Sequence, residues 1–247
     1  MSKTKKGGIA RILILAILFS VCGISSASFA VNPSVTVTWS DNKQEIDGFG
    51  ISQATNSEIL TMVSNPQVKA EILDKLFSPT NGAGFSIMRM MVGDATNDIE
   101  WGGPGDQPIK SIQPYEGVWN WNVDEHQIYV AREAIARGVS KLYATVWSPP
   151  AWMKTNNSTI GGYLRKDKYQ AFADYLSAYV RGYKTHHNLD IYAIGLQNEP
   201  NLWVGYSSCL YSGGELKDLL LNHVGPTFRN DNVTAKIVVG EHSSWRE

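Results

Sequence analysis

Cysteine is nearly absent from this chain, and its scarcity excludes a disulfide-stabilised fold. The 247 residues contain two cysteines, and one of them, Cys22, lies in an N-terminal segment that we expect to be removed. The remaining Cys209 has no partner for an internal disulfide. A domain without disulfides depends on a large apolar core, and roughly 217 residues are enough to build one.

An excess of charge of one sign is also lacking. The formal net charge is −1, and the Lys and Arg residues are scattered along the sequence. This pattern excludes a nucleic-acid-binding face and gives no reason to expect binding to an anionic membrane surface. The five histidines show no metal-ligand spacing, and the Gly102–Gly105 run lacks the spacing of a phosphate loop. We therefore expect no metal and no cofactor.

Long apolar runs are confined to the N-terminus. Lys3, Lys5, Lys6 and Arg11 precede the apolar stretch Ile12–Ile24, which is short for a membrane span. Small residues at Ser28 and Ala30 then fit a signal-peptidase site. The pattern predicts a signal peptide over residues 1–30 and a secreted protein that has no membrane segment after cleavage.

Aromatic residues, in contrast, are abundant. The chain has eight Trp and eleven Tyr, many of them beside Gly, Pro or Asn in predicted loops. Tryptophans in loops stack well on the C–H faces of sugar rings, although most tryptophans in proteins simply fill the core.

Apolar, β-branched segments alternate with amphipathic helical patterns, which predicts right-handed βαβ units and a parallel sheet. The predicted strands are Val35–Trp39, Ile46–Gly50, Phe85–Val92, Leu142–Trp147, Ile191–Leu196 and Lys236–Val239. The predicted helices cover 66–77, 124–137, about 167–184 and 215–223. After the first strand, this leaves five strands of βα type, fewer than the eight that a (β/α)8 barrel needs.

The strongest functional signal is the junction at which Ile191–Leu196 ends in Gln197-Asn198-Glu199-Pro200. An unbroken apolar run suits a strand in a parallel sheet, and chemistry in such sheets lies at the carboxyl ends of the strands. An amide and a carboxylic acid at that place point to a carbohydrate-hydrolysing site. The alternative is a strand-end Glu that merely caps the next helix.

Four segments together resemble the family 30 glycoside hydrolases, which include glucuronoxylanases, β-1,6-glucanases and glucosylceramidase-like enzymes. The segments are Ile46–Gly50, Phe85–Arg89, the Ser-Pro-Pro-Ala-Trp-Met-Lys-Thr-Asn block after Trp147, and Gln197–Pro200. The resemblance implies an α/β fold of the (β/α)8 barrel type with a small β-sandwich side domain. It assigns residues 31–45 to a strand of that side domain and residues 46–247 to an incomplete barrel of about strands one to five.

The same resemblance implies roles for individual residues. Glu199 matches the general acid/base and Asn198 a residue that binds a sugar hydroxyl. Trp147 and Asp94 look like sugar contacts, although a core Trp and an ordinary turn Asp are the alternatives. Arg89 looks like a group that orients the catalytic carboxylates, or one that merely neutralises a buried carboxylate. Trp152 and Trp203 are weaker candidates for sugar contacts.

A retaining glycosidase needs a second carboxylate as nucleophile, about 5–5.5 Å from the first. Glu241 follows the predicted strand Lys236–Val239 and Gly240, but it falls on strand five, where the family commonly has an acidic residue that is not the nucleophile. The resemblance places the nucleophile on strand seven, so we expect it beyond residue 247. This expectation makes the chain a truncated barrel, inactive alone and monomeric when complete.

The sequence thus predicts a secreted retaining β-glycoside hydrolase that acts on a cell-wall polysaccharide. Xylan is the first expected substrate, followed by β-1,6-glucan or galactan and then a glucosylceramide-like glycoside. A rival of another class is a carbohydrate-binding protein without catalysis, and a third possibility is an inactive truncation product.

Overall fold

The computed structural model describes residues 35–53, 57–96 and 109–244. The chain divides into two units, residues 1–46 and 47–247. The expected signal peptide lies outside the described residues. Within the first unit, residues 35–46 form a turn at Trp39-Ser40 and no strand. The predicted strand Val35–Trp39 is therefore wrong. An extended segment forms a strand only when it pairs with another strand, and no strand in the described residues pairs with this segment.

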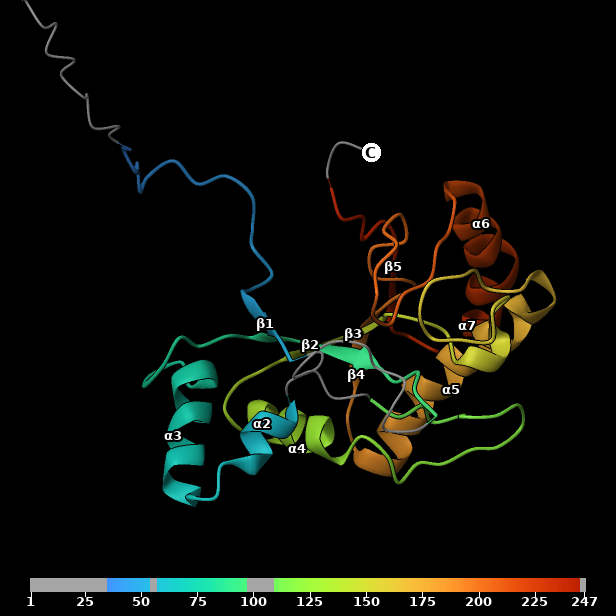
Figure 1. Ribbon diagram of the computed structural model, residues 1–247. Helices are drawn as coiled ribbons and strands as arrows, with labels where there is room; N and C mark the ends of the chain where they lie inside the picture. Colours follow the sequence, from blue (N-terminus) through green and yellow to red (C-terminus); the bar gives the residue numbers. More distant parts are fainter. Residues whose placement is uncertain (1–34, 54–56, 97–108, 245–247) are drawn as a thin grey trace, which may run out of the picture. The chain divides into compact units, whose positions relative to one another are not determined.

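The second unit is built around a five-stranded parallel sheet with the order β1-β2-β3-β4-β5 (Figure 1). The strands are β1 (Gly50–Ser52), β2 (Ile87–Val92), β3 (Lys141–Val146), β4 (Ile191–Gly195) and β5 (Lys236–Val238). Each strand pairs with the next one in the sequence, as in consecutive βα units. The predicted parallel sheet is confirmed.

The two faces of the sheet differ, because side chains along a strand alternate between faces. Met88, Met90 and Val92 of β2 belong to the main hydrophobic core together with residues of the helices. Arg89 has the opposite phase, and the register aligns it with Tyr143 of β3. The register also aligns Thr145 with Gly195. One face is therefore apolar and packed under helices, while the other carries polar groups.

Six α-helices, two 3-10 turns and one π-helix surround or connect these strands in the described residues. The α-helices are α2 (Ser57–Met62), α3 (Pro66–Phe77), α4 (Glu125–Ala136), α5 (Tyr169–His187), α6 (Gly213–Asp218) and α7 (Gly225–Asn230), and the others are η1 (Ala151–Met153), η2 (Lys166–Lys168) and η3 (Leu219–Val224). In Figure 1, α2, α3, α4 and α5 lie below the strands in the view. Helix α2 was not predicted from the sequence.

Local sequence signals explain where several helices begin and end. The side chain of Asn65 accepts hydrogen bonds from the N–H groups of Gln67 and Val68 at 2.9 and 3.2 Å, and Pro66 occupies the first position of α3. Helix α5 ends at His187 and is capped by Asn188, which adopts the left-handed conformation with φ 56°. These two helices lie close to their predicted ranges, as does α4.

The predicted helix 215–223 is too short. The structure continues it as α6, the π-helix η3 and α7, so that the helical path ends only at Asn230. Pro226 lacks an N–H group and would normally interrupt an α-helix. The wider turn of η3 lies directly before Gly225-Pro226, where a π-type turn changes the hydrogen-bond register.

The first barrel strand also begins later than predicted. Residues 46–49 are not in a strand, and β1 covers Gly50–Ser52. Gly50 lies so close to β2 that a Cβ atom there would be 2.7 Å from the Ile87 carbonyl oxygen. The glycine therefore permits the close approach with which the strand begins.

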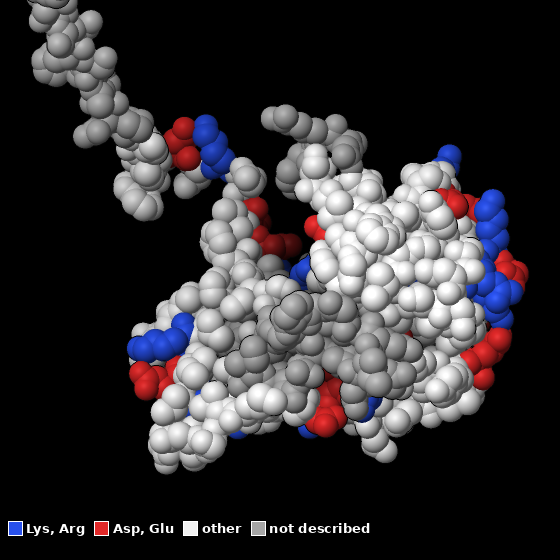
Figure 2. All heavy atoms as spheres, in the orientation of Figure 1, with Lys and Arg blue, Asp and Glu red and all other residues white. Residues whose placement is uncertain are grey.

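The face of the molecule drawn in Figure 2 carries Lys, Arg, Asp and Glu in small separate groups, without one large patch of a single sign. Within the described residues, no helix is long and apolar enough to cross a membrane.

Candidate active site

Polar side chains from four neighbouring strands meet on the face of the sheet opposite the main core. Arg89 comes from β2 and Thr145 from β3, whereas Asn198 and Glu199 follow β4. Glu241 follows β5 and forms a bridge of parallel type with Asn198. In a parallel sheet the carboxyl ends of the strands share one edge, so these residues lie together although they are distant in sequence.

Glu199 has an unusual backbone conformation. Its φ angle is 46°, in the left-handed region that residues other than glycine seldom adopt. The N–H group of Glu199 donates to the carbonyl oxygen of Glu241 at 2.8 Å, and its own carbonyl accepts from the N–H of Leu202 at 3.0 Å. A left-handed residue costs about 1–2 kcal/mol, and such strain persists where surrounding contacts enforce it.

The Glu199 carboxyl is only loosely held. Its Oε2 atom accepts from Asn198 Nδ2 at 3.4 Å and from the Tyr206 hydroxyl at 3.5 Å. Both contacts are at the outer limit of hydrogen bonding. The residue is partly exposed, so the carboxyl is accessible to a ligand.

Arg89 connects the groups around Glu199. Its Nη2 atom donates to Asn198 Oδ1 and to Glu241 Oε2, each at 2.8 Å, and its Nε atom donates to Thr145 Oγ1 at 3.3 Å. The guanidinium carbon lies 4.3 Å from the centre of the Trp147 ring, a cation–π contact. The arginine therefore fixes both the side chain of Asn198 and the carboxylate of Glu241.

Glu241 lies in a notch that a glycine provides. A Cβ atom on Gly195 would be 2.1 Å from Glu241 Oε1, 2.8 Å from the Tyr143 hydroxyl and 3.0 Å from Thr145 Oγ1. The hydroxyl of Thr145 also donates to Glu241 Oε1 at 3.3 Å. Burial raises the pKa of the Glu241 carboxyl above its ordinary value, and the charge and hydrogen bond of Arg89 oppose that shift.

The model of O-glycosyl hydrolase family 30 matches residues 32–247 of this sequence. This chain belongs to O-glycosyl hydrolase family 30.

Relatives of this family 30 chain are consistent with that assignment. It is 31% identical over 235 residues to an endo-1,6-beta-D-glucanase of Trichoderma harzianum, covering 86% of this chain and 46% of the relative. It is 27% identical over 221 residues to an endo-1,6-beta-D-glucanase of Neurospora crassa, covering 84% and 44%. The chain thus spans about half the length of the curated relatives that it matches.

A solved structure extends the likeness to the fold. The catalytic domain of GH30 xylanase C from Talaromyces cellulolyticus superposes with a TM-score of 0.68 at 29% identity, covering 82% of this chain and 48% of that structure. The five parallel strands and this partial coverage confirm the predicted fold class, a barrel-type sheet that is incomplete within these residues.

The remaining predicted sugar contacts of the family 30 chain lie in different surroundings. Trp147 is 8% exposed, with one ring face against Arg89. Asp94 is fully buried, and its carboxylate accepts from Ser207 Oγ at 2.6 Å. Trp152 is partly buried and donates from Nε1 to the Gln113 carbonyl at 3.0 Å. Sugar contacts through these three residues stay predictions, and burial makes them less accessible than the sequence suggested.

Trp203 is the most accessible of the predicted contacts. Its side chain is 68% exposed. Its indole Nε1 lies 2.6 Å from where a Cβ atom on Gly161 would be, so the ring lies over the backbone of the loop after β3. The structure therefore presents an aromatic ring in the same loop as Glu199, and its role in sugar binding stays a prediction.

No role in this site was predicted from the sequence for four residues: Gly195, Thr145, Tyr206 and Glu241. Glu241 was considered only as a possible nucleophile and set aside. Its position after a predicted strand was the one signal that could have identified it, because strand-end carboxylates gather at the same edge of the sheet. The contacts of the other three depend on the register between strands and on loop conformation.

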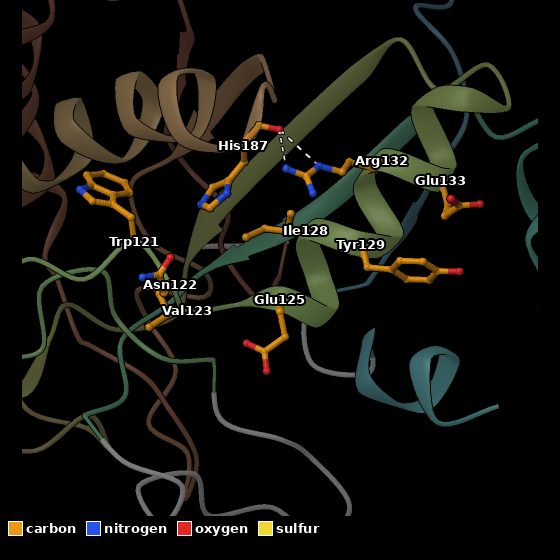
Figure 3. Close-up of a pocket in the computed structure, with 9 residues that line it drawn as sticks. All are labelled: Trp121, Asn122, Val123, Glu125, Ile128, Tyr129, Arg132, Glu133 and His187. Carbon is orange, nitrogen blue, oxygen red and sulfur yellow. Dashed lines mark hydrogen bonds between the residues drawn. The ribbon is translucent and has the colours of Figure 1, made fainter. Parts of the chain in front are cut away.

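A pocket of about 380 Å³ lies elsewhere, between the segment before α4 and the end of α5 (Figure 3). Arg132 donates to the His187 carbonyl across it at 3.0 and 3.3 Å, and Trp121 stacks on His186 with ring centres 4.6 Å apart. Its lining contains none of the residues that surround Glu199. We therefore place the candidate site at the strand ends and not in this pocket.

Residues that could bind a metal or react as a thiol do not compete with this site. In 35–53, 57–96 and 109–244, His, Cys, Asp and Glu side chains form no group of three that could hold a metal ion. Cys209 is buried, and burial raises the pKa of its thiol to about 11. A buried thiol of that pKa is a poor nucleophile.

Proposed function

We propose that this chain carries the general acid/base of a retaining β-glycoside hydrolase, with Glu199 as the proton donor. The observation that supports this role is the left-handed turn at Glu199, which the Glu241 carbonyl and the Leu202 N–H hold in place. The turn presents an accessible carboxyl beside an amide that Arg89 fixes. A positioned carboxylic acid can protonate the glycosidic oxygen as the bond breaks, and the same group can then activate water.

The proposal assigns the nucleophile to another carboxylate. Glu241 is a poor candidate, because Arg89 and Thr145 engage its two oxygens and its Oε1 lies in the notch at Gly195. A nucleophile must instead face the anomeric carbon, about 5–5.5 Å from the acid/base carboxyl. We place that glutamate outside residues 1–247, in keeping with a chain that spans about half the length of its relatives.

For the substrate we propose a cell-wall β-glycan, with β-1,6-glucan first and xylan second. From the sequence alone, xylan was expected first and β-1,6-glucan second. Two curated relatives named endo-1,6-beta-D-glucanase support the new order, and the related xylanase C keeps xylan as the alternative. The signal-peptide pattern in residues 1–30 supports secretion.

The test is hydrolysis by the purified natural gene product, with β-1,6-glucan, xylan and a glucosylceramide analogue offered in parallel. Proton NMR of the first products reports their anomeric configuration. We expect cleavage of β-1,6-glucan with the β-anomer formed first. An α-anomer would contradict retention, and binding of glycan without any cleavage would favour the non-catalytic alternative.

A further inference from the structure

Glu241 contacts the Glu199 segment in two independent ways. Its backbone carbonyl accepts the N–H of Glu199 at 2.8 Å. Its carboxylate accepts from Arg89 Nη2 at 2.8 Å, and the same Nη2 atom donates to Asn198 Oδ1 at 2.8 Å. One residue that follows β5 thus supports both the backbone and the neighbouring side chain of the proposed acid/base.

We propose that Glu241 is a positioning residue, which holds Arg89 and Asn198 so that the Glu199 carboxyl faces the glycosidic oxygen. This inference rests on the proposed function of Glu199. The path runs from the Glu241 carboxylate through the guanidinium of Arg89 to the amide of Asn198. The Asn198 Nδ2 atom then reaches Glu199 Oε2 at 3.4 Å.

The surroundings of Arg89 explain why a carboxylate is needed. The side chains of Arg89 and Glu241 are 24% and 16% exposed, so both charges are largely removed from water. Among the described residues, the other groups that face the guanidinium are Thr145, Asn198 and the rings of Tyr143 and Trp147, none of which carries a charge. Without Glu241, the arginine would keep an uncompensated charge next to Glu199, and its Nη2 atom would be free to leave Asn198.

A glycine on the neighbouring strand leaves room for the Glu241 carboxylate. Gly195 on β4 has no side chain where Glu241 Oε1 lies, and the Thr145 hydroxyl donates to that same oxygen at 3.3 Å. The backbone carbonyl at 241 would be present with any residue there, so the case for the side chain rests on its contact with Arg89, which also binds Asn198. Because one Arg89 nitrogen binds both Glu241 and Asn198, the carboxylate can position the amide as well as compensate the charge.

The test compares Glu241→Gln and Glu241→Asp with the parent enzyme in the natural gene product. The substrates are an alkyl glycoside, which needs acid assistance, and a 2,4-dinitrophenyl glycoside, which does not. For Glu241→Gln we expect kcat on the alkyl glycoside to fall by roughly 10- to 100-fold, part of the contribution that a general acid makes. KM should change little, the pre-steady-state burst rate on the dinitrophenyl glycoside, which reports glycosylation alone, should fall much less, and Glu241→Asp should restore part of the loss.

Two further variants separate the possible outcomes. In a Glu199→Gln background, Glu241→Gln should have little further effect, because the residue it positions is gone. Equal losses of the dinitrophenyl burst rate and of kcat on the alkyl glycoside, or undiminished losses in the Glu199→Gln background, would overturn the positioning role. Glu133→Gln on α4 is the matched control, since Glu133 forms an ion pair with Arg137 away from the site and should leave kcat unchanged. If Glu199→Gln itself shows no dependence on the leaving group, the proposed function fails, and the result is distinct from failure of the Glu241 role.

Discussion

Gly195→Ala should destabilise the protein by displacing the Glu241 carboxylate. The φ angle of Gly195 is not in the left-handed region, so the backbone accepts alanine and the cost is steric. The new Cβ would be 2.1 Å from Glu241 Oε1, whereas ordinary contact begins at 3.4 Å. The carboxylate must therefore withdraw by about 1.3 Å, which lengthens its 2.8 Å contact with Arg89 to about 4 Å.

The size of the effect follows from the interaction that is lost. A hydrogen bond to a charged group contributes about 1.5–3 kcal/mol, and the gain from replacing glycine is only about 0.4–1 kcal/mol. We expect the free energy of unfolding to fall by about 2 kcal/mol. For a domain of this size, that corresponds to a fall in Tm of roughly 4–8 °C.

The assay is thermal and urea unfolding followed by circular dichroism, with Gly213→Ala as the matched control. A Cβ atom on Gly213 would meet nothing within 4 Å, so this variant should be neutral or slightly stabilising. In a Glu241→Ala background, Gly195→Ala should cost less than about 1 kcal/mol, because the displaced group is absent. An equal cost in both backgrounds would refute the argument.

Two other predictions concern buried charges away from Glu199. Burial raises the pKa of Asp124 to about 7, against hydrogen bonds from Tyr183 and Gln127 that lower it. Because the folded state binds the proton more tightly, the free energy of unfolding should fall as pH rises from about 4 to 7. The fall should be at most about 4 kcal/mol, and smaller because the residue is partly exposed to water. Urea unfolding across that range should show this pH dependence in the parent and not in Asp124→Asn. Lys154 is 2% exposed and donates to Ser148 Oγ and to the carbonyls of Thr159 and Ser208. Lys154→Met should therefore lower the free energy of unfolding in urea by about 3–5 kcal/mol. A loss below about 1 kcal/mol would contradict a structural role for these three hydrogen bonds.

The sheet could be predicted from sequence because its signals are local. Apolar segments of strand length alternate with amphipathic helices, and the structure has β2 to β5 within a few residues of their predicted ranges. The position of Glu199 at a strand end followed from the same pattern. The strand predicted at Val35–Trp39 failed because strand formation depends on a partner, which the local sequence does not contain.

The finer geometry of the site depends on contacts between distant residues. The left-handed turn at Glu199 is held by a carbonyl at Glu241, and nothing in Gln197–Pro200 specifies that partner. Trp147 could be placed at a strand end, but its contact with Arg89 follows from the pairing of β2 with β3. The need for glycine at 195 becomes visible only once Glu241 is placed beside it.

The most direct test of the acid/base role is the leaving-group dependence of Glu199→Gln in the natural gene product. We expect kcat on an alkyl glycoside or the polysaccharide to fall by about 10²- to 10⁴-fold, because proton donation is lost. With a 2,4-dinitrophenyl glycoside, the glycosylation step needs no proton, so its rate in a pre-steady-state burst should stay close to that of the parent. Equal loss of that burst rate and of alkyl glycoside turnover would contradict the assignment of Glu199.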